Sequence, residues 1–178
     1  SRGSLTVAPA FAAKHDLAAK LSAKNEAITG AGMAGPMRSL LARGRMLKLD
    51  TVEVPYPVIA IPRDTKVALA ESEIAGNVGF GVLRQFAITY DLANDALYFE
   101  RYLNFGTPDI ADRGGIWLER GAEGFQVIDV VAAGPAAQAG LKAGDVIVEI
   151  NGRAWSEVSL PALRDALRGP AGSRVRMK

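Results

Sequence analysis

Short apolar runs separated by turn residues predict a mainly β protein. Between Arg45 and Pro62, prolines interrupt these runs at three positions. Proline cannot donate a hydrogen bond into a sheet ladder, so the proline-broken runs are expected to be edge strands or strand ends rather than central strands. Short runs rich in apolar residues place the expected strands at 46–49, 52–54, 58–61, 87–91 and 96–100.

The N-terminal segments have other patterns. Between Pro9 and Leu21, the residues Phe11, Leu17 and Ala18 recur at near-helical spacing, which predicts one amphipathic helix. Residues 24–38 are small and glycine-rich, and they are expected to form a hairpin or a mobile loop. Residues 74–86 pass from an apolar strand end through glycines into one helical turn.

The segment 24–38 contains a formal Gly-x-Gly-x-x-Gly match at Gly30, Gly32 and Gly35. This fingerprint binds dinucleotides when a buried strand precedes it and a helix follows it. Residues 24–29 are a poor buried strand, and the chain after the loop soon becomes strand-like. Nucleotide binding is therefore not expected, and no cofactor is predicted.

The last third of the chain has the clearest pattern. Two apolar runs, 127–131 and 146–150, flank a helical turn at Ala136–Ala139 that Gly140 can end in a left-handed conformation. Gly-Pro-Ala, then Ala-Gly-Leu-x-x-Gly-Asp-x-Ile and Asn-Gly, closely resemble a PDZ domain over residues 112–178. The resemblance implies a small α+β barrel with two helices that binds peptides. It also implies that the closing strand, which begins near Gly172, is shortened at Lys178.

The resemblance implies where a peptide binds. Gly115, Ile116, Trp117 and Leu118 stand where PDZ domains carry a carboxylate-binding loop and the strand that pairs with the peptide. The opposite wall is expected to be the helix 160–168. The leucines of this helix could instead be plain core, while Ile116 and Leu118 are expected to line the pocket. Trp117 could serve in domain packing or at an interface. The expected helix-wall residues are Leu160, Leu163 and Leu167.

Residues 1–104 resemble the C-terminal part of a retropepsin-like aspartic protease domain, and 105–111 read as a linker. Asn77-Val78-Gly79 matches the hydrophobic-hydrophobic-Gly element that precedes a short helix, with Asn77 at an apolar position. In this resemblance, Gly79 belongs to the active-site scaffold. The loop with Gly30, Gly32 and Gly35 is the flap that closes over substrate.

The catalytic motif of that family, Asp-Thr/Ser-Gly, is absent from the sequence. Asp50-Thr51 is followed by Val52, and Asp64-Thr65 by Lys66. The resemblance places the catalytic turn just before Ser1, so the chain alone is predicted to be inactive. The parent would be an aspartic endopeptidase whose second lobe comes from a homodimer or a preceding repeat. Alternatively, a non-catalytic protease-like scaffold carries a peptide-binding PDZ module.

Composition further limits which ligands, catalytic sites and metal sites the chain can have. A net charge of +2 with scattered basic residues gives no electrostatic case for nucleic acid. The absence of cysteine excludes thiolate catalysis and cysteine-based zinc sites. His15, the single histidine, is expected on the polar side of a helix, and no metal site is predicted. No run of 18 apolar residues occurs. PDZ domains occur together with bacterial proteases, and this association favours a periplasmic or envelope location.

Overall fold

The computed structural model describes residues 3–32, 35–63, 73–107, 110 and 112–178. It divides the chain into two compact units, Ser1–Asp109 and Ile110–Lys178, called unit 1 and unit 2 below. Strands make up most of the regular structure in both, so the prediction of a mainly β protein is confirmed.

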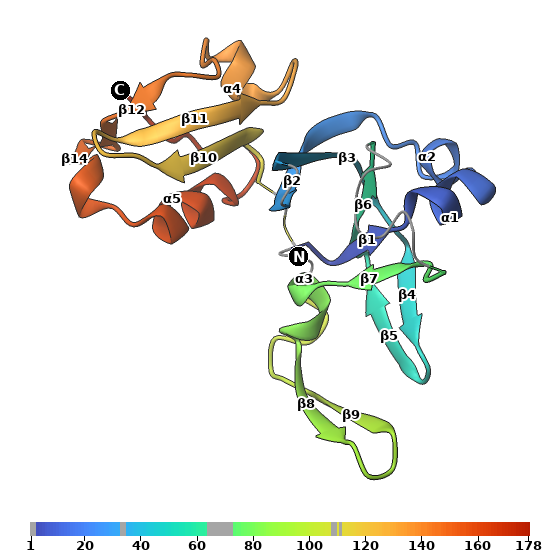
Figure 1. Ribbon diagram of the computed structural model, residues 1–178. Helices are drawn as coiled ribbons and strands as arrows, with labels where there is room; N and C mark the ends of the chain where they lie inside the picture. Colours follow the sequence, from blue (N-terminus) through green and yellow to red (C-terminus); the bar gives the residue numbers. More distant parts are fainter. Residues whose placement is uncertain (1–2, 33–34, 64–72, 108–109, 111) are drawn as a thin grey trace. The chain divides into compact units, whose positions relative to one another are not determined.

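Unit 1 is built on a five-stranded sheet with the order β2-β3-β6-β1-β7 (Figure 1). Strand β1 lies parallel to β6 and antiparallel to β7, while β2, β3 and β6 form antiparallel pairs. The strands are β1 (Leu5–Val7), β2 (Asn25–Gly32), β3 (Gly35–Arg43), β6 (Val58–Pro62) and β7 (Gly76–Val78). The hairpin expected within residues 24–38 is thus present as β2 and β3.

Strand β6 corrects the expectation that proline-broken runs are edge strands or strand ends. All five of its residues are buried, and it lies at the centre of the sheet between β3 and β1. Pro57 precedes the strand and Pro62 ends it. The prolines therefore remove no donor from the middle of the ladder, and the apolar run between them is free to occupy the centre.

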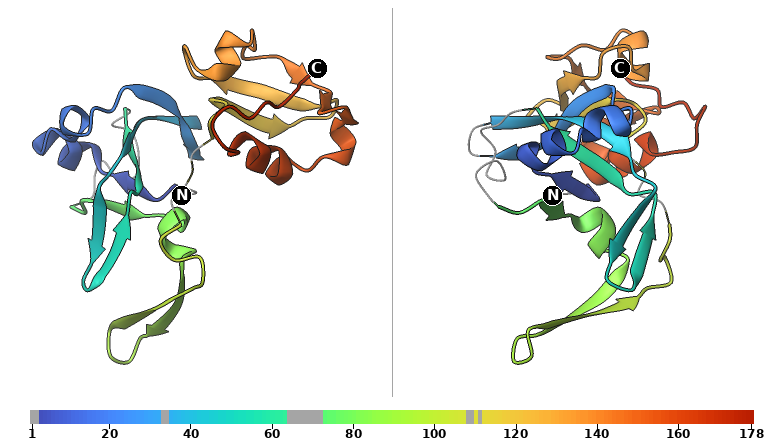
Figure 2. Two further views of the ribbon diagram at one scale, coloured as in Figure 1. Left: turned by 180° about the vertical axis from the view of Figure 1, so that it is seen from behind. Right: turned by 90° about the vertical axis from the view of Figure 1, so that its right-hand side faces the viewer.

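Two short helices replace the single helix expected at 9–21. They are α1 (Pro9–Lys14) and α2 (Leu17–Lys20), and Asp16 between them has a left-handed φ of 51°. Residues of both helices pack in the core formed with β1 and β6. Figure 2 shows the two helices, in blue, beside the sheet. His15 is exposed, and its ring lies 4.4 Å from that of Phe11. The predicted polar position of His15 is confirmed.

The remaining strands of unit 1 form two separate hairpins. One consists of β4 (Met46–Leu49) and β5 (Val52–Pro55), the other of β8 (Phe86–Asp91) and β9 (Ala96–Arg101), close to the predicted ranges. Between β7 and β8 lies α3 (Phe80–Leu83), the expected helical turn. Phe86 packs with Val54 and Val82 in a second core, which anchors the β8–β9 ribbon at its base (Figure 1).

Unit 2 combines two small sheets with two helices. The first sheet has the order β10-β11-β12, and the second pairs β13 with β14. The elements are β10 (Ile116–Arg120), β11 (Phe125–Val130), α4 (Pro135–Gln138), β12 (Val146–Ile147), β13 (Glu149–Ile150), β14 (Arg153–Ala154), the 3-10 turn η1 (Trp155–Glu157) and α5 (Leu160–Leu167). Gly140 follows α4 with a φ of 90°, as predicted.

The run 146–150 corrects one detail, because it is two strands rather than one. At Val148, between β12 and β13, the backbone N–H donates to the carbonyl of Lys178 at 2.8 Å. Met177 forms a single antiparallel bridge with Ile150. The residues near Lys178 therefore add a third partner segment at this point, which interrupts the strand.

The core of unit 2 joins the first sheet to α5. Phe125 and Leu163 are both completely buried, and Val127 and Ile147 are 1% exposed. Ser159 caps the N-terminus of α5 by accepting the N–H of Ala162 at 3.2 Å. Cap and apolar stripe together hold the helix against β10 and β11.

We expect Leu163→Ala to lower the free energy of unfolding of unit 2 by about 2–5 kcal/mol, because it leaves a cavity in a fully buried site. Val148→Ala, at an exposed position, is the control and should change it by less than about 1 kcal/mol. Both tryptophans lie in unit 2, so urea unfolding followed by their fluorescence reports on this unit within the whole chain. Equal effects of the two substitutions would contradict this assignment of the core.

Candidate functional site

Strand β10 has one paired edge and one open edge. Among the described residues it pairs with β11 alone. At one end of this pair, the N–H of Val131 donates to the carbonyl of Gly115 at 2.8 Å, and at the other end Gly121 donates to Gly124 at 2.8 Å. Bonded and non-bonded residue pairs alternate along an antiparallel ladder. The two end bonds therefore determine which way each backbone group of β10 points.

Counting residues along β10 from either end hydrogen bond gives the same orientation for each backbone group. The backbone groups of Trp117 and Glu119 face β11, and those of Ile116, Leu118 and Arg120 face the open edge. The register shift between Trp117 and Leu118 does not alter this, because each end is counted separately. The open edge thus presents alternating N–H and C=O groups, the pattern to which another extended chain can pair.

Helix α5 lies across from this edge. The Nη2 atom of Arg164 donates to the carbonyl oxygen of Leu118 at 3.0 Å, which confirms that this carbonyl points away from β11. The Arg164 guanidinium also lies 5.8 Å from the ring centre of Trp117. We call the space between the open edge of β10 and α5 the β10–α5 groove. Arg164 spans it, and the sequence reasoning had not identified this residue.

Most of the apolar residues predicted to line a pocket lie in the core. Leu118 is 2% exposed and Leu163 is fully buried, while Ile116 and Leu167 are also buried. Trp117 and Leu160 are half-buried. These four buried side chains belong to the core. The groups that a ligand could contact in the groove are therefore mainly backbone groups and the Arg164 side chain. The predicted helix at 160–168 is confirmed as α5, followed by Arg168 as its C-terminal cap.

The turn that leads into β10 is closed by internal hydrogen bonds. The N–H of Gly115 donates to Oδ1 of Asp112 at 2.9 Å, and that of Arg113 donates to the carbonyl of Leu167 at 3.0 Å. A Cβ on Gly114 would lie 2.9 Å from a Leu167 methyl and 3.1 Å from Oδ1 of Asp112, so a side chain there would force these neighbours to shift. The turn therefore wraps closely around the Asp112 carboxylate.

Burial raises the pKa of the Asp112 carboxyl above its usual value. Backbone hydrogen bonds from Gly115 and Gly114 oppose this rise, as do the positive charges of Arg168 and Arg164. Asp112 was not among the residues predicted from the sequence. An Asp just before two glycines was nevertheless a recognisable feature, because Asp side chains in turns often accept hydrogen bonds from the backbone that follows.

The candidate residues of unit 1 lie apart in its sheet. Gly30 is in β2, Gly32 pairs with Gly35 across the hairpin, and the tip residues 33–34 lie outside the described residues. Gly79 precedes α3, and its N–H donates to the carbonyl of Ser4 at 2.9 Å. A strand rather than a helix follows the glycine fingerprint, so the context for dinucleotide binding is missing.

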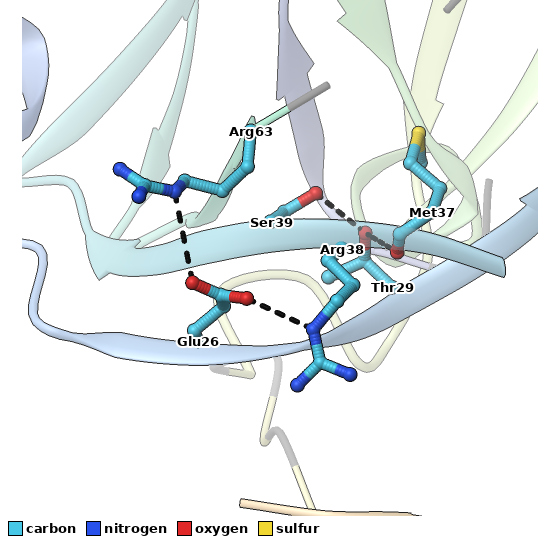
Figure 3. Close-up of polar contacts among 6 residues, drawn as sticks. All are labelled: Glu26, Thr29, Met37, Arg38, Ser39 and Arg63. Atoms are coloured by element: carbon cyan, nitrogen blue, oxygen red, sulfur yellow. Dashed lines mark hydrogen bonds and ion pairs between the residues drawn. The ribbon is translucent and has the colours of Figure 1, made fainter.

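Polar contacts brace the β2–β3 hairpin (Figure 3). Glu26 lies between Arg38 and Arg63, with N–O distances of 2.8 and 3.6 Å. The hydroxyl groups of Thr29 and Ser39 lie 2.7 Å apart, and Ser39 is fully buried. These contacts join β2 to β3 and link the pair to Arg63, just after β6.

Unit 1 also contains an apolar cavity of about 870 Å³. Aliphatic and aromatic side chains from the α1–α2 region, β1 and the β4–β5 hairpin line most of it, and none of the described residues that line it carries a carboxylate. Asp50 is exposed in the turn between β4 and β5, and Asp64 lies outside the described residues. The cavity suits an apolar group.

Within the described ranges, no three His, Asp or Glu residues gather closely enough to hold a metal ion. A helix long and apolar enough to cross a membrane is also absent from this part of the chain.

Among protein families, the model described as PDZ domain matches residues 126–178, which include all but the first residue of β11, together with α4 and α5. The match begins after β10 and the turn at Arg113–Gly115. No curated protein and no solved structure shows significant similarity to the chain.

We expect the Asp112 carboxylate to make unit 2 less stable at neutral pH than in acid. Its pKa is raised on folding, so this unfavourable contribution is full above the raised value and disappears as the pH falls to the unfolded value near 3.8. The unfolding free energy of the wild type, relative to that of Asp112→Asn, should therefore increase as the pH is lowered. Tryptophan fluorescence in urea at several pH values measures this difference. A relative decrease in acid would show that the pKa is lowered instead.

Proposed function

Because residues 126–178 form a PDZ domain, a peptide-binding module, we propose that unit 2 binds extended peptide segments, including C-terminal tails of proteins, in the β10–α5 groove. The open backbone edge of β10 is the observation that carries this proposal. The backbone N–H and C=O groups of Ile116, Leu118 and Arg120 lie on the open edge of β10 and face α5. A peptide strand can pair with this edge by β-addition.

Arg164 sets a condition on this binding. Its guanidinium donates to the Leu118 carbonyl, which is one of the acceptors that an added strand requires. A bound peptide N–H takes over this carbonyl, and the Arg164 side chain moves aside. The hydrogen bond lost from arginine is replaced by one from the peptide, so the exchange leaves no buried acceptor unpaired.

Hydrogen exchange tests the proposal at single residues. We expect a bound peptide to slow amide exchange of Ile116, Leu118 and Arg120 by about tenfold or more, because these N–H groups gain a partner. Trp117 and Glu119 donate toward β11 already and serve as internal controls with much smaller changes. Peptides selected from a random decapeptide display library provide the probe. Equal protection of all five amides, or none, would argue against strand addition at this edge.

We also propose that unit 1 is the C-terminal part of an aspartic-type endopeptidase domain. The arrangement around β1 favours it: the N–H groups of Gly79 and Gly81 donate to the carbonyls of Ser4 and Gly3, at 2.9 and 3.1 Å. The glycine turn before α3 thus lies beside the segment that enters β1. In the retropepsin resemblance, these are the scaffold and the chain that leaves the catalytic turn.

The chemistry of this second proposal requires residues outside the sequence. Two Asp-Thr/Ser-Gly turns, one from each of two lobes, would share a proton between their carboxylates and activate a water. One turn would precede Ser1 in the parent, and the other would come from a homodimer or a preceding repeat. The alternative is a scaffold without activity, in which peptide binding by unit 2 is the whole function.

The upstream coding sequence distinguishes these alternatives. We expect Asp-Thr-Gly or Asp-Ser-Gly directly before Ser1, and peptidase activity in the longer product that Asp→Asn at that position lowers by at least about 100-fold. Residues 1–178 alone are the control and should be inactive. Any other residues at the upstream position would exclude the catalytic proposal and leave peptide binding intact.

A further inference from the structure

We infer that residues 102–106, called the linker anchor below, fasten the start of the linker to unit 1 and so limit how far unit 2 can move. The side chain of Gln85 holds the linker anchor in place. The inference concerns the covalent connection between the two units, and it does not depend on what either unit binds.

Gln85 joins helix α3 to both ends of the linker anchor. This residue follows α3 and is 3% exposed. Its Nε2 atom donates to the carbonyl of Gly81 at 3.1 Å, and its Oε1 atom accepts the N–H of Gly106 at 3.0 Å. Its backbone carbonyl accepts the N–H of Tyr102 at 3.0 Å. A buried amide left without these partners would be costly, so the bonds favour the anchored state.

The linker anchor is itself a compact turn that packs on unit 1. The N–H of Phe105 donates to the carbonyl of Tyr102 at 2.9 Å, and the centres of the Phe105 and Phe86 rings lie 5.3 Å apart. The guanidinium of Arg101 lies 4.5 Å from the centre of the Phe105 ring. Gly106 has a left-handed φ of 81°, which glycine adopts without strain. Apolar packing and hydrogen bonds therefore fix the same short segment.

The other end of the linker is fixed to unit 2. The N–H of Arg113 donates to the carbonyl of Leu167 at 3.0 Å, and Oδ1 of Asp112 accepts the N–H of Gly115 at 2.9 Å. The chain that can move freely therefore lies between the linker anchor and Asp112.

The length of this free chain sets the range of unit 2. The N–H of Thr107 still bonds within the anchor turn, to the carbonyl of Asn104 at 3.1 Å. Five peptide links join Thr107 to Asp112, and they span at most about 18 Å. Without the anchor, the free chain would start after Arg101 at the end of β9, and eleven links would span about 40 Å. The anchor thus reduces the reach of unit 2 by about half.

The restricted range has a consequence that rests on the proposed peptide binding. A chain held in the β10–α5 groove remains within reach of the point where the linker leaves unit 1. Effective concentration falls as about the −3/2 power of tether length, so release of the anchor would lower that of the bound chain about threefold.

Backbone dynamics test the linker anchor in the full chain. We expect the ¹⁵N order parameters of its amides to be about 0.85, like those of β9, although the side chain of Leu103 is fully exposed. Gln85→Ala and Gly106→Pro should each lower them below about 0.6. The first removes the shared side chain, and the second removes the donor and cannot adopt the left-handed φ. Gln138→Ala, which removes an exposed glutamine bonded to a backbone carbonyl, is the matched control and should leave them unchanged.

The order parameters of β8 and β9 show whether unit 1 is folded in each variant. Gly106→Pro leaves Gln85 in place, so it decides the test if Gln85→Ala unfolds unit 1. Order parameters below about 0.6 in the wild type, or equal values in the wild type and Gly106→Pro, would overturn the inference. Unchanged values in a folded Gln85→Ala would contradict the role of Gln85.

Distances between two spin labels test the restricted range. The sequence has no cysteine, so Ala13→Cys in α1 and Gln126→Cys in β11, both at exposed positions, provide the only thiols for labelling. We expect Gly106→Pro to broaden the distance distribution about 1.5-fold, as the square root of tether length predicts. Insertion of six Gly/Ser residues after Thr107 gives the same free length with the anchor intact, and it should broaden the distribution equally.

Broadening by the insertion but not by Gly106→Pro would overturn the role of the linker anchor. No broadening by either would show that the tether does not set the range, and would overturn the inference as a whole. Both measurements use the chain without a ligand. Their failure therefore leaves the proposed peptide binding intact, and amide exchange in β10 tests that binding separately.

Discussion

The open edge of β10 depends on the burial of its side chains. Ile116 and Leu118 are held in the same core as Leu163 and Leu167 of α5, and this burial sets the face and register of the strand. A strand anchored in this way can leave one row of backbone groups without a ladder partner and still remain in place. Helix α5 lies across this edge, and the hydrogen bond from Arg164 to the Leu118 carbonyl joins the two elements.

Two charged side chains act on that groove, one at its start and one at its middle. Asp112 fills the turn that leads into β10, and Arg164 caps the Leu118 carbonyl in the middle of the strand. Both interactions satisfy backbone groups that would otherwise be exposed or partly desolvated. They also mean that a ligand must exchange hydrogen bonds with the protein rather than simply fill empty positions, which favours ligands with a regular extended backbone.

In unit 1 a short strand is held by pairing on both of its edges, unlike β10. Strand β1 is short, yet it is paired on both sides, parallel to β6 and antiparallel to β7. Gly76 permits this arrangement, because a Cβ there would lie 2.5 Å from the carbonyl oxygen of Thr6. The β8–β9 ribbon, by contrast, pairs only within itself among the described residues and is anchored at its base by the rings of Phe86, Phe99 and Phe105.

The sequence by itself determined the local elements: the hairpins, the turn at Gly140, helix α5 and the PDZ-like pattern of the last third. These follow from short-range periodicity and from glycine positions, which act within a few residues. Only the tertiary structure decided that β6 is central, that Asp16 breaks the first helix, and that Asp112 and Arg164 reach the groove. The central place of β6 and the reach of Arg164 depend on contacts between residues distant in sequence, whereas Asp112 bonds a residue only three positions away. Arg164 and Leu118, 46 positions apart, meet because the shared core brings α5 to β10, and periodicity carries no information about such a meeting.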